Sequence, residues 1–209
     1  MKILSHRGYW HEASEKNTLK AFKRSLEHGY GFESDIRDFC GKLIISHDLG
    51  SEDSINADNV FHMLQEYQDQ YTFAVNIKAD GLKDVLLGSL KKYQIQNYFC
   101  FDMSIPQMIE YTDLGIKFFT RQSEYEPAPV IMLDQAQGIW LDAFYDYGWI
   151  TPELIQKYIS LGKSVCIVSP ELHQHPYKTF WDMLLHSGVD LEDVMLCTDL
   201  PDVASDYFY

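Results

Sequence analysis

Two acidic residues in the first part of the chain have the spacing of a paired carboxylate site. Glu33 and Asp35 lie two positions apart within a strand-like run, so both side chains point to the same side of a strand. Two like charges on a buried face are costly unless a cation or hydrogen bonds offset them. Carboxylate oxygens are hard ligands, so the pair favours a bound divalent cation, Mg²⁺ or Ca²⁺ rather than zinc.

Imidazole and cationic side chains occur at comparable positions. His6 and Arg7 end one strand-like run, His47 follows another, and Lys78 lies at the end of a third, where a lysine suggests a bound anion. Phosphodiester cleavage concentrates negative charge on the phosphoryl oxygens, which a metal ion with Arg7 and Lys78 could stabilise. Two imidazoles that titrate near neutrality can deprotonate the attacking hydroxyl and protonate the departing alkoxide. A single histidine at a strand end is more often structural, so it is the combination that indicates phosphodiester cleavage.

The elements that must position these side chains alternate between strands and helices. Short runs rich in β-branched and aromatic residues predict strands at 2–6, 31–36, 72–77, 97–102, 116–120, 138–142, 164–169 and 194–198. Helical spacing of apolar residues predicts helices at 17–28, 57–68, 82–93, 104–114, 151–161 and 177–187. Asn17 can cap the first helix and Gly29 can close it. The fifth strand is followed only by a weak segment around 130–136.

This alternation predicts the fold. Eight strand–helix repeats without a Pro/Ser-rich linker indicate an α/β fold, a single-domain (β/α)8 TIM barrel over residues 1–209. An extra extended run at 43–46 predicts a small β-hairpin insertion after the second strand. The alternative, an open doubly wound sheet, would normally carry a glycine-rich first turn, where only Gly8 is present. Strands of a closed barrel have no edge, so Glu33 and Asp35 would face its interior, and functional groups gather where the strands end.

Composition limits the classes of partner. The 209 residues carry 17 basic and 31 acidic side chains, a net charge of −14, so the surface repels nucleic-acid backbones. No apolar run approaches the roughly 20 residues that cross a bilayer. Residues 1–7 do not have the pattern of a signal peptide, so we expect a cytoplasmic protein. The four cysteines lack metal-ligand spacing, and we expect free, mostly buried thiols.

The ordered motif resembles the glycerophosphodiester phosphodiesterase family of the phosphatidylinositol-phospholipase-C-like barrel superfamily. The resemblance is carried by His6-Arg7-Gly8, Asn17-Thr18-Leu19-x-Ala21-Phe22, Glu33-x-Asp35 and His47-Asp48. Beyond this motif, Asn76-Ile77-Lys78 lies where the family has Glu-x-Lys, and Thr198-Asp199-Leu200-Pro201 is similar to its final-strand signature. The motif covers residues 6–48, about a fifth of the chain.

The resemblance implies a role for each matching position. His6 and His47 would be the general acid/base pair, and Arg7 and Lys78 would contact the phosphate. The metal ligands would be Glu33, Asp35 and Asn76. The implied reaction is the hydrolysis of a small glycerophosphodiester to an alcohol and glycerol phosphate, as part of lipid metabolism. Direct attack by water and a cyclic phosphate intermediate both remain open.

Three positions depart from the family pattern. Lys16 replaces a glutamate that usually precedes the Asn-Thr pair, although Glu15 lies beside it, and Cys40 replaces an aspartate in the hairpin turn. The third departure is Asn76, which stands where the family has a carboxylate. An amide oxygen can bind Mg²⁺ or Ca²⁺, but the ligand set loses one negative charge. We therefore predict a weaker metal site than is typical, with Asp102 as a possible replacement ligand.

Other functions are less consistent with these residues. A non-catalytic barrel that binds a phosphorylated ligand or a partner would fit Asn76, but binding alone has no use for two proton-transfer groups. A sphingomyelinase-D-like lyase uses a similar residue set but usually acts outside the cell. An amidohydrolase-type metal barrel usually has two histidines on its first strand, whereas this chain has only His6 there.

Overall fold

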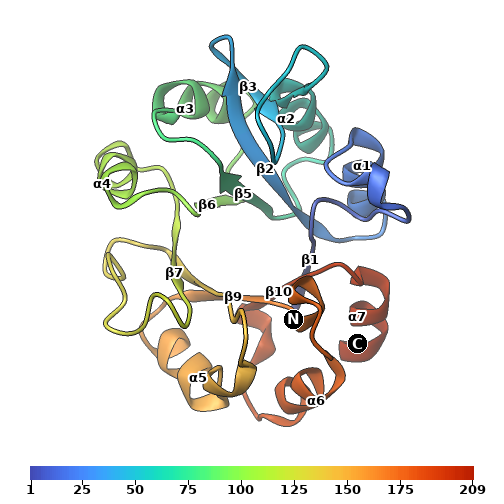
Figure 1. Cartoon of the computed structure of the whole chain (residues 1–209), viewed down its shortest axis with the longest axis vertical. Coiled ribbons are helices and arrows are strands. Elements are labelled where there is room, and N and C mark those ends of the chain that lie inside the picture. Colours follow the sequence, from blue (N-terminus) through green and yellow to red (C-terminus); the bar gives the residue numbers. More distant parts are fainter. The chain divides into compact units, whose positions relative to one another are not determined.

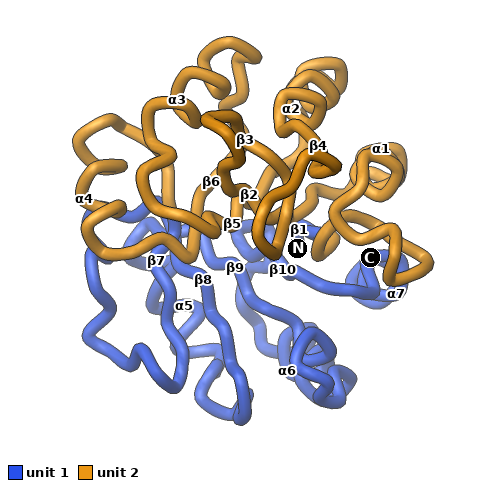
Figure 2. The backbone as a smooth tube through the Cα atoms, turned by 45° about the horizontal axis from the view of Figure 1, so that its top comes forward, with its two compact units in different colours: residues 1–4, 119–209 blue, residues 5–118 orange.

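The computed structural model describes residues 1–209, which form two compact units. Unit 1 comprises residues 1–4 and 119–209, and unit 2 comprises residues 5–118 (Figure 2). The candidate site residues, from His6 to Asp102, all belong to unit 2. The prediction of a single domain stays a prediction. None of the helices combines the length and the apolar character that crossing a bilayer requires.

Unit 2 is built on a mixed sheet that carries the paired carboxylates. Its strands are β2 (Gly31–Phe39), β3 (Lys42–Ile45), β4 (Ile55–Asn56), β5 (Phe73–Ile77) and β6 (Tyr98–Phe101), of which Figure 1 labels all but β4 and Figure 2 labels β4. They lie in the order β4-β3-β2-β5-β6, with β2, β5 and β6 parallel and β3 antiparallel to both β2 and β4. The predicted hairpin insertion after the second strand is therefore present, as β3 and the end of β2.

Unit 2 has four helices: one before β2, one after β4, one after β5 and one after β6. They are α1 (Leu19–Glu27), α2 (Ala57–Glu66), α3 (Lys83–Lys92) and α4 (Ile105–Leu114), and a short 3₁₀ turn, η1 (Ala13–Glu15), precedes α1. The prediction that Asn17 caps the first helix is wrong. Thr18 caps it, because its hydroxyl accepts a hydrogen bond from the backbone N–H of Ala21 at 3.3 Å. The side chain of Asn17 instead donates a hydrogen bond to Asp35.

An aromatic layer joins the helices of unit 2 to its sheet. The ring of Phe22 on α1 stacks on Phe32 of β2 with centroids 4.6 Å apart, and Phe32 lies 4.9 Å from Phe73 of β5. Phe61 on α2 meets Phe73 edge-on. All four side chains are fully buried. Burial of aromatic area on this scale fixes β2 and β5 against α1 and α2.

The strand alternation turns the polar residues to the other face of the same sheet. Phe32 faces the helices, so Glu33 and Asp35 point away from them, as expected for a period of two. In the register of β2 with β5, Asp35 is the partner of Asn76, so the two side chains lie next to each other on one face. Glu33 and Asp35 are almost completely buried, and Asn76 is 8% exposed.

Unit 1 holds the remaining strands. They are β1 (Lys2–Ser5), of which residues 2–4 belong to this unit, β7 (Phe119–Gln122), β8 (Gly138–Leu141), β9 (Ser164–Val168) and β10 (Val194–Thr198), in the order β1-β10-β9-β8-β7. The helices are α5 (Pro152–Ser160), α6 (Lys178–His186) and α7 (Pro201–Phe208). Three 3₁₀ turns complete the unit: η2 (Tyr147–Trp149), η3 (Pro170–His173) and η4 (Leu191–Asp193).

The predicted elements agree with these bounds except around the fifth strand. The strand predicted at 116–120 begins at Phe119, and Phe118 makes only an isolated bridge to Cys100. The weak segment around 130–136 forms turns rather than a helix. All four cysteines are free; Cys40 is exposed and the other three are buried, as expected.

Candidate active site

The carboxylate of Asp35 is the centre of the polar cluster in unit 2. Its Oδ2 atom accepts a hydrogen bond from Asn17 Nδ2 at 2.7 Å and lies 3.1 Å from Arg7 Nε. Its Oδ1 atom lies 3.1 Å from Lys78 Nζ, on the far side of the carboxylate. Burial by itself would raise the pKa of Asp35, but Lys78, Arg7 and the Asn17 amide together hold this pKa below its usual value. Asp35 is therefore ionised between two cations.

The carboxylate of Glu33 lies in a less compensated environment. Its Oε2 atom accepts the backbone N–H of Arg7 at 3.0 Å and lies 3.9 Å from Nε2 of His6. Burial, together with the negative charge of Asp35, raises the pKa of Glu33 to about 7, although His6 and Arg7 oppose the shift. Glu33 and Asp35 thus have pKa values pushed in opposite directions on one strand.

The raised pKa of Glu33 predicts how metal-free stability depends on pH. Between about pH 4.5 and 7 the folded protein holds a proton that the unfolded chain has lost, so stability falls as the pH rises through this window. The size of the effect is about 3 kcal/mol. Glu33→Gln does not titrate, so we expect it to remove this loss and to be more stable than wild type at pH 8.

Urea unfolding in a chelator at pH 5 and pH 8 measures the difference. Glu52→Gln is the matched control, because Glu52 is exposed on a loop and should leave the pH dependence of wild type unchanged. If Glu33→Gln loses as much stability as wild type between the two pH values, then Glu33 does not carry the proton.

His47 follows β3, whose end is hydrogen-bonded to the backbone of Asp35. The N–H of Ser46, which follows β3, donates to the carbonyl oxygen of Asp35 at 3.1 Å, so the chain returns to the level of the carboxylates. Arg37 Nη1 donates to the carbonyl oxygen of His47 at 3.3 Å. The imidazole of His47 is about half exposed, and its Nδ1 atom lies 3.0 Å from Asp48 Oδ1. The structure thus groups His6, Arg7, Glu33, Asp35, Asn76 and Lys78. His47 lies in the segment after β3, and its ring pairs with Asp48.

The oxygen atoms of this cluster fit a hard divalent cation. Asn76 Oδ1 is buried without a hydrogen-bond partner, and Asp35 Oδ1 faces Lys78 as an ion pair but receives no well-directed hydrogen bond. Two such oxygens on neighbouring strands, with Glu33 on the same face, are ligands that Mg²⁺ or Ca²⁺ prefers. No three His, Cys, Asp or Glu side chains form a metal-binding group, which agrees with the presence of Asn76 in place of a carboxylate.

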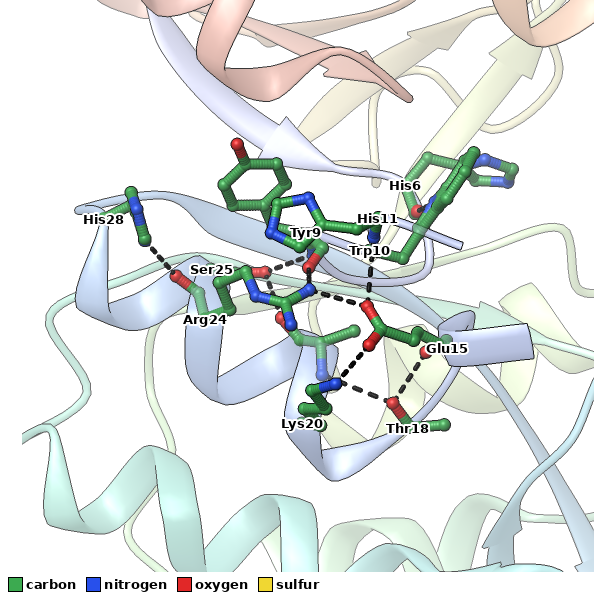
Figure 3. A network of polar contacts seen from close by, with 11 residues as sticks. His6, Tyr9, Trp10, His11, Glu15, Thr18, Lys20, Arg24, Ser25 and His28 are labelled. Carbon is green, nitrogen blue, oxygen red and sulfur yellow. Dashed lines mark hydrogen bonds and ion pairs between the residues drawn. The ribbon is translucent and has the colours of Figure 1, made fainter. Parts of the chain in front are cut away.

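The loop that carries His6 and Arg7 is held to α1 by a network around Glu15 (Figure 3). The Glu15 carboxylate accepts the backbone N–H of His11 at 3.0 Å and pairs with Arg24 at 2.7 Å and with Lys20. The Arg24 hydrogen bond and the other donors lower the pKa of Glu15. Trp10 Nε1 donates to the carbonyl oxygen of His6 at 3.1 Å. Glu15 therefore anchors the loop next to the position where Lys16 departs from the family pattern.

Asn17 is the site residue that the sequence analysis missed. Besides its bond to Asp35, its Oδ1 atom accepts a hydrogen bond from the hydroxyl of Ser34 at 2.9 Å. Both residues belong to or adjoin the family motif, so the motif itself was a signal. The signal was misread because Asn next to Thr at a helix start also has the pattern of a cap.

Unit 1 has polar residues of its own where β8 and β9 end. Asp142 follows β8, and its Oδ1 atom lies 2.7 Å from Nε2 of His173 on η3. Glu171, also on η3, accepts hydrogen bonds from Ser169 and from Thr198 at the end of β10. Within unit 1 these bonds hold the segments that follow β8, β9 and β10 in place.

Two solved structures are similar to the chain over nearly all of its length. One is a glycerophosphodiester phosphodiesterase from Agrobacterium tumefaciens, 16% identical, with a TM-score of 0.69 over 99% of this chain and 98% of that one. The other is a glycerophosphoryl diester phosphodiesterase from Parabacteroides distasonis, 12% identical, with a TM-score of 0.71 over 99% of this chain and 85% of that one. The chain matches no protein-family model and no curated protein.

At these identities the likeness is one of fold. It confirms the predicted fold class, an α/β fold of the TIM-barrel type with a hairpin insertion after the second strand. The family resemblance carried by residues 6–48 is thereby confirmed at the level of the fold: the chain has the fold of the glycerophosphodiester phosphodiesterases.

Proposed function

We propose that the chain is a phosphoric diester hydrolase that converts a small glycerophosphodiester and water to an alcohol and glycerol phosphate. The observation that carries the proposal is the cluster around Asp35, where Arg7 and Lys78 lie 3.1 Å from opposite carboxylate oxygens and His6 lies close to Glu33. Two cations beside an imidazole are suited to a phosphoryl group that gains charge as its ester bond breaks. The likeness to two phosphodiesterases supports the same reaction.

Glu33, Asp35 and Asn76 would hold a divalent cation, Mg²⁺ or Ca²⁺. When bound, such an ion polarises the phosphoryl group and stabilises its developing charge. Its ligand set carries two formal negative charges, and Arg7 and Lys78 already neutralise much of this charge at Asp35. The proposal therefore includes modest metal affinity, with Asp102 as an alternative source of a third carboxylate.

Arg7 and Lys78 would bind the phosphate through their free donors while they remain close to Asp35. This gives the phosphate a fixed position next to the imidazole of His6. One of His6 and His47 would accept the proton of the attacking hydroxyl, and the other would donate a proton to the departing alkoxide. The Glu33 carboxylate lies 3.9 Å from Nε2 of His6, and the Asp48 carboxylate lies 3.0 Å from Nδ1 of His47, so each imidazole has an acidic side chain beside it.

The proposal is tested with a panel of glycerophosphodiesters and a bis-aryl phosphodiester, each with Mg²⁺, Ca²⁺ or a chelator. We expect a glycerophosphodiester to release glycerol phosphate with at least one of the two metals. Phosphorus NMR identifies the product and reveals a cyclic phosphate if a neighbouring hydroxyl attacks first. The variant with both His6 and His47 replaced by Asn, purified in parallel, controls for a contaminating phosphodiesterase. Binding of inorganic phosphate without hydrolysis of any diester would contradict the proposal and favour a non-catalytic binding protein.

A further inference from the structure

Asn17 has a backbone conformation that L-amino acids rarely adopt. Its φ is +58°, in the left-handed region, and so is that of Arg7, at +56°. The N–H of Asn17 donates to the carbonyl oxygen of Arg7 at 2.9 Å, so these two residues close the base of the loop between β1 and α1. Their side chains then converge on one atom, because Arg7 Nε and Asn17 Nδ2 both approach Asp35 Oδ2.

The orientation of the Asn17 amide is determined by a neighbour. Ser34 is completely buried, and its hydroxyl donates to Asn17 Oδ1 at 2.9 Å. Since the oxygen of the amide is occupied by this donor, the nitrogen must be the atom that faces Asp35, where it donates at 2.7 Å. Ser34 and Asp35 are adjacent in β2, so one strand both orients the amide and receives its hydrogen bond.

The two oxygens of the Asp35 carboxylate have different partners. Oδ2 accepts the hydrogen bond from Asn17 and forms an ion pair with Arg7, whereas Oδ1 has only the ion pair with Lys78. An unrestrained carboxylate could rotate about its Cβ–Cγ bond and change the plane of its oxygens. The hydrogen bond from Asn17, together with the ion pairs to Arg7 and Lys78, restricts this rotation.

We propose that Asn17, oriented by Ser34, is a positioning residue that fixes the Asp35 carboxylate for cation binding and catalysis. The inference rests on the proposed function and deepens it. Asn17 acts only through Asp35 and Arg7 and needs no contact with the substrate. Residues that orient a metal-binding carboxylate through a hydrogen bond typically change affinity or activity by about 10–100-fold when they are lost.

A purely structural role for Asn17 makes a different prediction. Asn is one of the few residues that tolerate the left-handed region, so the backbone conformation alone could require it. Glycine adopts the same φ without strain but has no amide side chain. Asn17→Gly therefore keeps the backbone and removes the hydrogen bonds to Asp35 and Ser34, which separates the two roles.

The experiment compares wild type with Asn17→Gly, Asn17→Asp and Ser34→Ala by calorimetric titration of Mg²⁺ and Ca²⁺, steady-state kinetics and thermal unfolding. For Asn17→Gly we expect the affinity for the metal and the kcat to fall by about 10-fold or more, with KM little changed. The melting temperature should stay within about 4 °C of wild type. Asn17→Asp replaces the hydrogen-bond donor by a second negative charge beside Asp35, so its metal affinity and kcat should fall further than those of Asn17→Gly. In Ser34→Ala the amide remains, so metal affinity and kcat should fall less.

Thr18→Ala is the matched structural control. It removes the cap of α1 next to Asn17 and should lower the melting temperature by about 2–4 °C, while metal affinity stays that of wild type. Wild-type metal affinity and kcat in Asn17→Gly would overturn the positioning role. If wild type binds Mg²⁺ or Ca²⁺ but hydrolyses no diester, the proposed function fails, and the difference in affinity between wild type and Asn17→Gly still decides the role of Asn17. Binding of neither metal and hydrolysis of no diester would overturn both.

Discussion

His6→Asn should lower the turnover of the preferred glycerophosphodiester by about 10²-fold or more. The expectation follows from the position of the ring, which is 20% exposed and has its Nε2 atom 3.9 Å from the buried carboxylate of Glu33. Asparagine has a similar size at the Nδ1 position but cannot hold a proton that titrates near neutrality. The measurement is kcat at saturating diester and metal, with circular dichroism to verify folding.

His62→Asn is the matched control for this substitution. His62 lies on α2, its side chain is 62% exposed, and its only ion-pair partner is Glu66 one turn along the helix. We expect wild-type turnover from this variant. The comparison separates the loss of an imidazole at the site from the general effect of replacing a histidine.

His47→Asn should reduce turnover to a similar extent if His47 is the second proton-transfer group. Its imidazole is about half exposed and pairs with Asp48. We therefore expect Asp48→Asn to lower turnover less than the loss of the imidazole in His47→Asn. Each single variant should also lose one limb of the bell-shaped pH profile that two acid/base groups produce. Activity within a few-fold of wild type in both His6→Asn and His47→Asn would refute the acid/base assignment.

The strands and most helices could be predicted from the local sequence pattern, because the buried residues of each element recur with the period of that element. Phe32 lies on one face of β2, and Glu33 and Asp35 lie on the other, as their spacing predicts. The fifth strand shows where local pattern fails. The apolar run at 116–120 is ambiguous by itself, and the strand begins at Phe119 because the pairing with β8 starts there, at Gly138. Register is a property of two strands and cannot be read from one of them.

The site could be predicted in its residue types but not in its connections. The residue types predicted a divalent cation at Glu33 and Asp35 and a phosphate at Arg7 and Lys78. In the structure Arg7 and Lys78 themselves lie 3.1 Å from the Asp35 carboxylate. The contact of Arg7 with Asp35 depends on the loop between β1 and α1, and the contact of Lys78 depends on the pairing of β5 with β2. That loop brings Asn17 to Asp35 through a residue with positive φ, and no spacing along the chain encodes this contact.

Asn76→Asp should tighten the binding of Mg²⁺ or Ca²⁺ by about 10-fold or more. The substitution keeps the size of the side chain and adds one negative charge beside Asp35, on the face where Asn76 Oδ1 has no hydrogen-bond partner. Without metal the same charge is repulsive, because Glu33 and Asp35 are buried nearby. We therefore expect Asn76→Asp to melt at a lower temperature than wild type in a chelator and to gain more from added metal.

Three further variants make the result interpretable. Gln156→Glu adds the same charge to an exposed position of α5 and should leave metal affinity unchanged. Asn76→Ala removes the amide oxygen and should weaken binding if Asn76 is a ligand. Binding that survives Asn76→Ala but disappears in Asp102→Ala would instead identify Asp102 as the third ligand. If neither wild type nor Asn76→Asp binds Mg²⁺ or Ca²⁺ at millimolar concentration, the metal site itself is refuted, and Arg7 and Lys78 remain as the only cations that the cluster offers to a phosphate.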